Sequence, residues 1–304
     1  MLIDLSDHAK YRATGNDRSR FLNGQLTNDI LSLQAGTAIY ACALTAKGKL
    51  CSELYVAATK DSHYLDTDPV LRESLSARLE RYIIADDVAL EDVTDEFGLF
   101  HLLNLDSSGA HSEISLPIIF SEDAKGFLIA SNRFGVPGID LWFPASDAAS
   151  VLAQLKESPL DSETAENFRI EQGIARWGYE LSENVIPNEA GLDKNAISYT
   201  KGCYLGQEVI SRIKSVGHVN RFLRGLLPAS GVAVEMGDKL FSNKQPDKEI
   251  GFVTSVARNR SAGSAIALGY IKRGFDAPGS TLQVRRNNIL IGPIEVRSLP
   301  FNSA

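Results

Sequence analysis

The chain has 304 residues, of which 44% are hydrophobic and 23% charged, and its formal net charge is −7 at pH 7. This length predicts two or three domains, each able to bury its own core, and the composition is typical of a globular protein in water. The negative charge argues against a surface that coats nucleic acid, because binding to phosphate backbones requires clustered Lys and Arg.

Two features bear on localisation. No apolar run approaches the roughly 20 residues that a membrane-spanning helix needs. Residues 1–6 contain an early acid, Asp4, and lack the basic region and apolar core of a signal peptide. We therefore expect a cytoplasmic protein that contacts neither a membrane nor nucleic acid directly.

The first part of the chain alternates strands with helices. Beyond a short strand and turn within 4–15, runs rich in β-branched and apolar residues predict strands at 39–44, 50–57, 88–93, 98–105, 114–120, 126–130 and 138–143. Capping residues and amphipathic patterns predict helices at 17–22, 70–82, 149–155 and 163–173. This order indicates an α+β architecture rather than a regular βαβ series, and no G-x-G-x-x-G follows a strand, which disfavours a dinucleotide-binding fold.

The boundaries of these elements carry their own signals. Asp17 is expected to cap the first helix and Gly24 to end it. Residues 46–48, Ala-Lys-Gly, are expected to form the hairpin turn between the strands at 39–44 and 50–57. Asp68 precedes a proline at the first helical position of the second helix.

The sequence pattern changes near residue 224, from alternating strands and helices to strands alone. Short β-rich segments separated by Gly or Asn turns are expected at 223–227, 232–234, 239–241, 250–257, 265–271, 281–285 and 289–296. This pattern predicts a small all-β barrel or sandwich. We place the domain boundary near residues 224–228, which divides the chain into regions 1–225 and 226–304.

The cysteines do not form a recognisable metal site. Cys42, Cys51 and Cys203 include no C-x-x-C pair, so the sequence predicts neither a disulfide framework nor a zinc or iron–sulfur ligand set. No metal ligands are predicted.

Residues 201–208, Lys-Gly-Cys-Tyr-Leu-Gly-Gln-Glu, are the densest run of chemically capable side chains. Leu205, Val209 and Ile213 share one helical face, which predicts a loop running into a helix with Cys203 at or just before the first turn. The helix dipole and Lys201 would there favour a thiolate. The alternative is that Cys203 is a small buried hydrophobe, as many free cysteines are.

This run resembles the K-G-C-Y-x-G-Q-E signature of the YgfZ family, folate-binding proteins that support iron–sulfur enzymes and tRNA modification. The resemblance extends through residues 17–29, 44–48, 169–173 and 180–187. The family is related to the glycine-cleavage T-protein, a tetrahydrofolate-dependent aminomethyltransferase. The resemblance implies two mixed α+β domains around a central cleft, plus a C-terminal β-barrel.

A folate makes chemical demands that can be stated in advance. A carboxylate can accept the paired N–H groups of its aminopyrimidine ring, aromatic or apolar walls suit its ring system, and Arg or Lys suits its glutamate tail. Residues 176–183 offer all three types. By resemblance to the T-protein, Trp177 and Glu183 correspond best to the pterin contacts, and Glu180 is the competing carboxylate.

Further side chains are candidates for the same ligand. The turn at 24–29, whose Asn and Asp side chains are expected to satisfy their own backbone, would by resemblance also approach the folate. Gln207 is expected on roughly the same helix face as Cys203 and could orient it or the folate, and Tyr204 could stack on the pterin or pack in the core. The cations expected to meet the folate tail or the carboxylates are Arg169, Arg176, Lys201 and Arg212.

One departure from the T-protein concerns the aspartate that supports chemistry at the folate amine. Its expected position falls on Ser52, which cannot carry a negative charge at its normal pKa. Glu53 would replace it only if the strand register moved by one residue. Aminomethyl or other one-carbon transfer is therefore the alternative function.

The sequence thus predicts a tetrahydrofolate-binding protein that supports assembly or repair of iron–sulfur clusters in client enzymes, including enzymes that thiolate tRNA. Cys203, with Lys201 beside it, is the candidate catalytic group, as nucleophile, redox relay or temporary ligand for iron or sulfur. Whether the protein turns over a substrate is left open.

Overall fold

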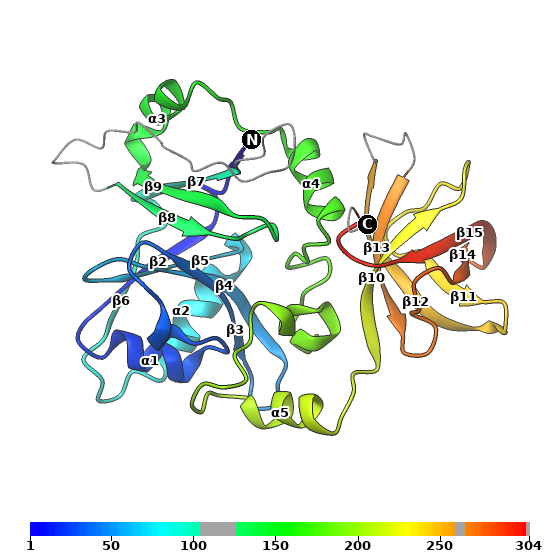
Figure 1. Cartoon of the computed structure of the whole chain (residues 1–304), viewed down its shortest axis with the longest axis horizontal. Helices are drawn as coiled ribbons and strands as arrows, with labels where there is room; N and C mark the ends of the chain where they lie inside the picture. The colour runs from blue at the N-terminus through cyan, green and yellow to red at the C-terminus, as the bar shows by residue number, and fades with distance from the viewer. Residues whose placement is uncertain (104–125, 259–264, 302–304) are drawn as a thin grey trace. The chain divides into compact units, whose positions relative to one another are not determined.

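The computed structural model describes residues 1–103, 126–258 and 265–301. The chain forms two compact units, each discontinuous in sequence (Figure 1). Unit 1 comprises Met1–Asp161 with Lys194–Gln207, and unit 2 comprises Ser162–Asp193 with Glu208–Ala304. Each unit has its own sheets and core.

Unit 1 contains a five-stranded antiparallel sheet in the order β3-β4-β5-β2-β6. Its strands are β3 (Ala38–Leu44), β4 (Leu50–Ala58), β5 (His63–Thr67), β2 (Ala9–Thr14) and β6 (Ala89–Asp92). One face packs against helices α1 (Arg18–Gln25) and α2 (Arg72–Glu80), because alternate residues such as Leu54 and Val56 point toward Leu22 and Leu79 in one buried cluster. Two 3₁₀ helices, η1 (Ile30–Ser32) and η2 (Pro69–Leu71), extend this layer.

A second antiparallel sheet of unit 1 has the order β1-β7-β9-β8. Its strands are β1 (Leu2–Asp4), β7 (Phe97–Leu103), β9 (Gly138–Pro144) and β8 (Phe127–Ser131). Phe100, Leu141 and Phe143 share a core with α3 (Ala148–Leu155), which follows η3 (Ala145–Asp147). The opposite face packs on the first sheet, where the rings of Tyr64 and Trp142 lie 5.4 Å apart between centroids.

Unit 2 is built on a closed six-stranded barrel in the order β10-β13-β12-β11-β14-β15. Its strands are β10 (Arg221–Pro228), β11 (Lys239–Ser242), β12 (Gln245–Arg258), β13 (Ala265–Lys272), β14 (Thr281–Arg286) and β15 (Ile289–Arg297). Leucine, isoleucine and valine side chains fill the interior, because alternate residues of each strand face inward. Helix α4 (Ser162–Glu171) packs on β12. Unit 2 also contains η4 (Pro187–Ala190) and most of α5 (Gln207–Ser215). The chain passes from one unit to the other within η5 (Leu192–Lys194) and at the start of α5.

Much of the predicted architecture is confirmed. The structure combines helices with antiparallel sheets in an α+β arrangement and has a C-terminal closed barrel. In the predicted hairpin turn, Gly48 adopts φ +71° and donates its N–H to Thr45 O. Asp68 caps η2 by accepting the N–H of Val70. The predicted boundary between regions 1–225 and 226–304 falls inside β10 and stays a prediction.

Several boundaries were wrong for identifiable reasons. Gly24 does not end α1, which continues to Gln25, and the Asp17 carboxylate accepts the N–H of Asp87 instead of capping the helix. Residues 232–234 form no strand, although Val234 lies in the barrel core. The strand predicted at 114–120 lies outside the described residues.

The start of α5 also differs from the prediction. The helix begins at Gln207, so Cys203 is separated from it by residues 204–206. Gly206 adopts φ +89°, a left-handed conformation that cannot continue a helix. Cys203 therefore precedes the first turn and is not part of it, and the expected shared helical face with Gln207 does not exist.

We expect Gly251→Ala to destabilise the barrel by about 2 kcal/mol, a typical cost of forcing extra atoms into a packed site. A Cβ at Gly251 would lie 2.2 Å from the backbone oxygen of Tyr270, which cannot move aside as a side chain can. Urea unfolding measures the change. Gly24→Ala is the control, because a Cβ there meets nothing within 4 Å; equal effects of the two substitutions would contradict the prediction.

Candidate functional site

The face of β4 that points away from α1 and α2 carries Glu53. In the register of β3 and β4, Cys42 lies opposite Glu53 and Tyr40 opposite Tyr55, so these four side chains share one face. The rings of Tyr40 and Tyr55 stack with centroids 4.7 Å apart. Glu53 is half-buried and hydrogen-bonds with Tyr40.

Ser52 points to the opposite face of the strand. Its hydroxyl is fully buried, lies 3.1 Å from Oγ1 of Thr67 and donates to the backbone oxygen of Glu53 at 2.9 Å. A register shift between Ala43 and Leu44 leaves Cys51 as an extra residue on β4. The expectation that Ser52 takes the acidic position, with Glu53 turned away, does not describe this strand: the carboxylate on the tyrosine-lined face is that of Glu53.

The surroundings of Glu53 favour its protonated form. Burial is the largest cause, and with the negative charges of Asp66 and Asp68 it raises the pKa of Glu53 to about 7, although His8 and the Tyr40 hydroxyl act in the opposite direction. A carboxyl group with this pKa can both donate and accept a proton near neutral pH.

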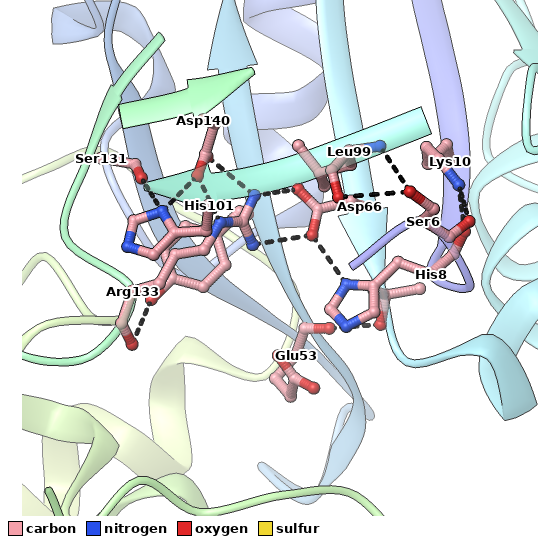
Figure 2. A network of polar contacts seen from close by, with 12 residues as sticks. Ser6, His8, Lys10, Glu53, Asp66, Leu99, His101, Ser131, Arg133 and Asp140 are labelled. Atoms are coloured by element: carbon pink, nitrogen blue, oxygen red, sulfur yellow. Dashed lines mark hydrogen bonds and ion pairs between the residues drawn. The ribbon is translucent and has the colours of Figure 1, made fainter. Parts of the chain in front are cut away.

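A buried ionic network lies between the two sheets of unit 1 (Figure 2). The guanidinium of Arg133 donates to both oxygens of Asp66 at 2.8 and 2.6 Å, and to both oxygens of Asp140 at 2.8 Å. His8 Nδ1 lies 3.0 Å from Asp66, and His101 Nδ1 lies 2.7 Å from Asp140. Despite burial, the Arg133 charge and these hydrogen bonds hold the pKa of Asp66 and of Asp140 below the usual range.

Residues 194–207, which we call the strap, cross unit 1 next to the end of α1. Thr27 Oγ1 donates to Ala196 O at 2.6 Å, and Ser198 N donates to Thr27 O at 3.0 Å. Lys201 Nζ donates to the backbone oxygens of Asn23, Leu26 and Asn28, at 2.5, 2.7 and 2.7 Å.

The functional candidates on the strap differ in exposure. Cys203 is exposed, whereas Tyr204 is buried with its ring centroid 5.1 Å from Lys201 Nζ. Burial lowers the pKa of Lys201 to about 8, opposed by Asp29. Tyr204 thus packs in the core, which was one of the two expectations for it. Gln207, at the end of the strap, is half-buried.

The other candidates lie in unit 2. Glu180 is 1% exposed, and its carboxylate accepts from Ser255 Oγ at 2.6 Å and from Arg169 Nη1 at 3.0 Å. Glu183 is exposed, Trp177 is half-buried, and Arg212 is an exposed partner of Glu208. Of the two competing carboxylates, Glu183 is thus the one whose side chain faces solvent.

Arg176 lines a pocket of about 600 Å³ within unit 2. It pairs with Glu166 at 2.9 Å and stacks over the Tyr179 ring at 4.2 Å. The pocket lies among α4, the loop after it and β12, and is lined by Ser162, Glu163, Glu166, Arg176, Tyr179, Val234, Glu235, Met236, Thr254, Ser255 and Val256. Among the described residues, no group of three or more His, Cys, Asp or Glu side chains is placed to hold a metal ion, and no helix is long and apolar enough to cross a membrane.

Sequence reasoning did not find the Arg133 network. The available signal was the polar residues inside otherwise apolar strands, Asp66 in β5 and Asp140 in β9. Their pairing with Arg133 joins segments 67 and 7 residues apart, which local patterns do not reveal.

Comparison with known proteins identifies the fold. Residues 1–114 match the GCVT N-terminal domain, and residues 221–302 match the glycine cleavage T-protein C-terminal barrel domain. The chain has a T-protein-like fold. The crystal structure of glycine cleavage system aminomethyltransferase T from Bartonella henselae matches with a TM-score of 0.83 at 20% identity, covering 99% of this chain and 85% of that one.

Sequence relatives agree with this assignment. A chloroplastic putative transferase of Arabidopsis thaliana is 28% identical over 305 residues, covering 93% of this chain and 68% of the relative. An aminomethyltransferase of Listeria monocytogenes is 26% identical over 305 residues, covering 94% of this chain and 82% of the relative. The T-protein-like fold therefore extends over nearly the whole chain.

We expect Arg133→Met to lower the free energy of unfolding by about 3–5 kcal/mol at pH 7, because two buried carboxylates lose their partner. The loss should shrink in acid. Since both carboxyls have lowered pKa values in the fold, the stability they contribute is complete above the ordinary Asp value of about 3.9 and decreases below it. Urea unfolding from pH 7 to pH 3 measures this.

Arg12→Met is the matched control, because Arg12 pairs with Glu91 at the surface and should change stability by only about 0–1 kcal/mol. An Arg133→Met effect of the same size, or one independent of pH, would refute the role assigned to the network.

We expect Glu53→Gln to stabilise the protein at pH 8 and to have little effect at pH 4. The raised pKa of Glu53 means that the folded state binds an extra proton between the ordinary Glu value and about 7, so its stability falls as pH rises through that range. After allowance for partial exposure, the gain at pH 8 is about 1–2 kcal/mol. Urea unfolding of Glu53→Gln and the exposed control Glu73→Gln tests this, and no gain specific to Glu53 at pH 8 would contradict it.

Proposed function

We propose that this protein binds tetrahydrofolate, or a related folate, and supports assembly or repair of iron–sulfur clusters in client enzymes, including enzymes that thiolate tRNA. The observation that carries the folate part is the T-protein-like fold over nearly the whole chain, because relatives with this fold are named aminomethyltransferases. The resemblance to the T-protein implies tetrahydrofolate as the ligand. The iron–sulfur part rests on the Lys-Gly-Cys-Tyr-x-Gly-Gln-Glu signature and on the exposure of its Cys203.

The residues of unit 1 suit the ring end of a folate. Stacked Tyr40 and Tyr55 provide an aromatic surface, and Glu53 beside them provides a carboxyl group that can hold or release a proton near neutral pH. The Glu53 carboxyl group could therefore exchange a proton with an amine of the folate. Unit 2 offers a separate set for the same ring, exposed Glu183 and half-buried Trp177, with Arg176 and Arg212 as cations for the glutamate tail; we take this set as the proposed site and the unit 1 face as its alternative.

Cys203 is the group proposed to serve the client enzymes. Its side chain is exposed on the strap, so a partner protein can reach the thiol directly. A thiolate can act there as nucleophile, redox relay or transient ligand. Cys42 is less suited, because burial strongly raises the pKa of its thiol.

A second candidate is a folate-dependent one-carbon transferase. The specific observation in its favour is Glu53, because its carboxylate faces the tyrosine-lined side of β4 and could stabilise a developing positive charge on a folate adduct. On this face Glu53, and not Ser52, is the acid that a transferase would use.

Calorimetric titration with tetrahydrofolate tests the first proposal. We expect saturable binding by the wild type, at least tenfold weaker binding by Glu183→Gln, which corresponds to about 1.4 kcal/mol, and binding within about twofold of wild type by Cys203→Ala. Glu180→Gln is the matched comparison. The Glu180 carboxylate is already hydrogen-bonded within unit 2, so this substitution should lower the stability of the protein. Absence of binding by the wild type would rule out the folate proposal.

Client activity separates the two functions. In cells that depend on this protein, Cys203→Ala should lower iron–sulfur client activity and tRNA thiolation while folate binding persists. Steady-state turnover of an aminomethyl or methyl donor that is lost in Glu53→Gln and kept in Cys203→Ala would instead establish the transferase.

A further inference from the structure

The contacts of Lys201 do not fit a group that acts on the neighbouring thiol. An ammonium has three N–H donors, and all three of Lys201 are used by backbone oxygens of Asn23, Leu26 and Asn28. None is left for a Cys203 thiolate. The distances of 2.7 Å to Leu26 O and Asn28 O are typical of charge-assisted N–H···O hydrogen bonds.

Asn23 O belongs to the last turn of α1, where backbone oxygens lack partners within the helix, and Leu26 and Asn28 follow that turn. The N–H of Leu26 closes the last turn on Leu22 O, which leaves the next two carbonyls, of Asn23 and Gly24, to be satisfied from outside. The strap supplies both partners: Lys201 Nζ for Asn23 O, and the N–H of Leu205 for Gly24 O at 3.3 Å. The negative end of the helix dipole favours a cation at this place.

The same site orders the residues on both sides of Cys203. Tyr204 is buried beneath the ammonium, and Gly206 fits only because it has no side chain, since a Cβ there would lie 2.5 Å from Thr45 O. Between Lys201 and Tyr204, Gly202 and Cys203 are exposed. The exposed thiol is therefore presented by a short segment held at both ends.

We propose that Lys201 is a positioning residue whose ammonium, enclosed by the backbone oxygens of Asn23, Leu26 and Asn28, holds the strap against the end of α1 and so presents Cys203 to its partner. The proposal rests on the proposed role of Cys203 and specifies how that thiol is placed. A neutral amine has two N–H groups and would leave one carbonyl unsatisfied, so the charged form is needed. With a pKa of about 8, Lys201 is mainly an ammonium at neutral pH. The charged group facing it is the Asp29 carboxylate, and the neutral ring of Tyr204 lies beside it.

The test compares positioning with activation of the thiolate. In Lys201→Ala, hydrogen exchange of the Ser198 and Leu205 amides, which donate to Thr27 O and Gly24 O, should accelerate by about tenfold or more. The midpoint of the pH profile for alkylation of Cys203 by iodoacetamide, read at that residue by peptide mass spectrometry, should stay unchanged. Lys60→Ala, which removes an exposed lysine of unit 1, is the control and should alter neither.

Chemical rescue adds a readout that a general loss of stability would not give. Methylammonium added to Lys201→Ala should restore slow exchange at both amides, whereas guanidinium at equal ionic strength should not, because its planar donors cannot converge on three oxygens that surround one point. Lys201→Arg keeps the charge near Cys203 and is expected to show the fast exchange of Lys201→Ala. This variant keeps the test decisive if Lys201→Ala does not fold.

Three results would overturn the proposal: unchanged exchange in both Lys201 variants, equal or no rescue by the two cations, or an upward shift of the alkylation midpoint in Lys201→Ala with exchange unchanged. None of these measurements uses folate or a client enzyme. If Cys203→Ala retains full client activity while the exchange and rescue results hold, the proposed function fails and the role of Lys201 in holding the strap stands.

Discussion

The arrangement of unit 1 depends on one buried cation, Arg133, held between two buried carboxylates. Asp66 belongs to the five-stranded sheet and Asp140 to the four-stranded sheet, so the guanidinium fixes the two sheets relative to each other (Figure 2). Removing charges from water is costly, and only the near-complete hydrogen bonding of all three groups offsets that cost. A hydrophobic contact would tolerate small sliding of one sheet over the other, whereas this geometry does not.

The consequence reaches the tyrosine-lined face of β4. Arg133 lies over the ring of Tyr55 at 4.2 Å, and Tyr55 stacks on Tyr40 beside Glu53. The ionic network therefore sets the position of the aromatic pair, while the charge of Asp66 contributes to the raised pKa of Glu53. A carboxyl group that titrates near neutral pH costs stability in its ionised form, and such costs are typical of functional sites.

The strap uses a different physical solution for a similar purpose. The end of α1 has carbonyl oxygens that the helix cannot satisfy, and the signature segment satisfies them with an ammonium and a backbone N–H. In this way a structural requirement of the helix holds the segment that carries the exposed thiol. The conformation of Gly206 and the burial of Tyr204 account for two further positions of the signature by packing alone.

The sequence by itself determined the classes of structure and several local features: the α+β character, the hairpin at Gly48, the cap at Asp68, most barrel strands and the signature around Cys203. These depend on periodicity and turn chemistry within a few residues. Only the tertiary structure decided that the face of β4 carrying Glu53, and not the one carrying Ser52, is shared with Tyr40, because the pairing register of β3 with β4 sets which residues lie opposite each other. It alone decided that Lys201 meets the end of α1 and that Glu180 is satisfied by Arg169 and Ser255. Each of these contacts joins residues that no local pattern connects, and their geometry follows from strand pairing and packing that the linear sequence does not display.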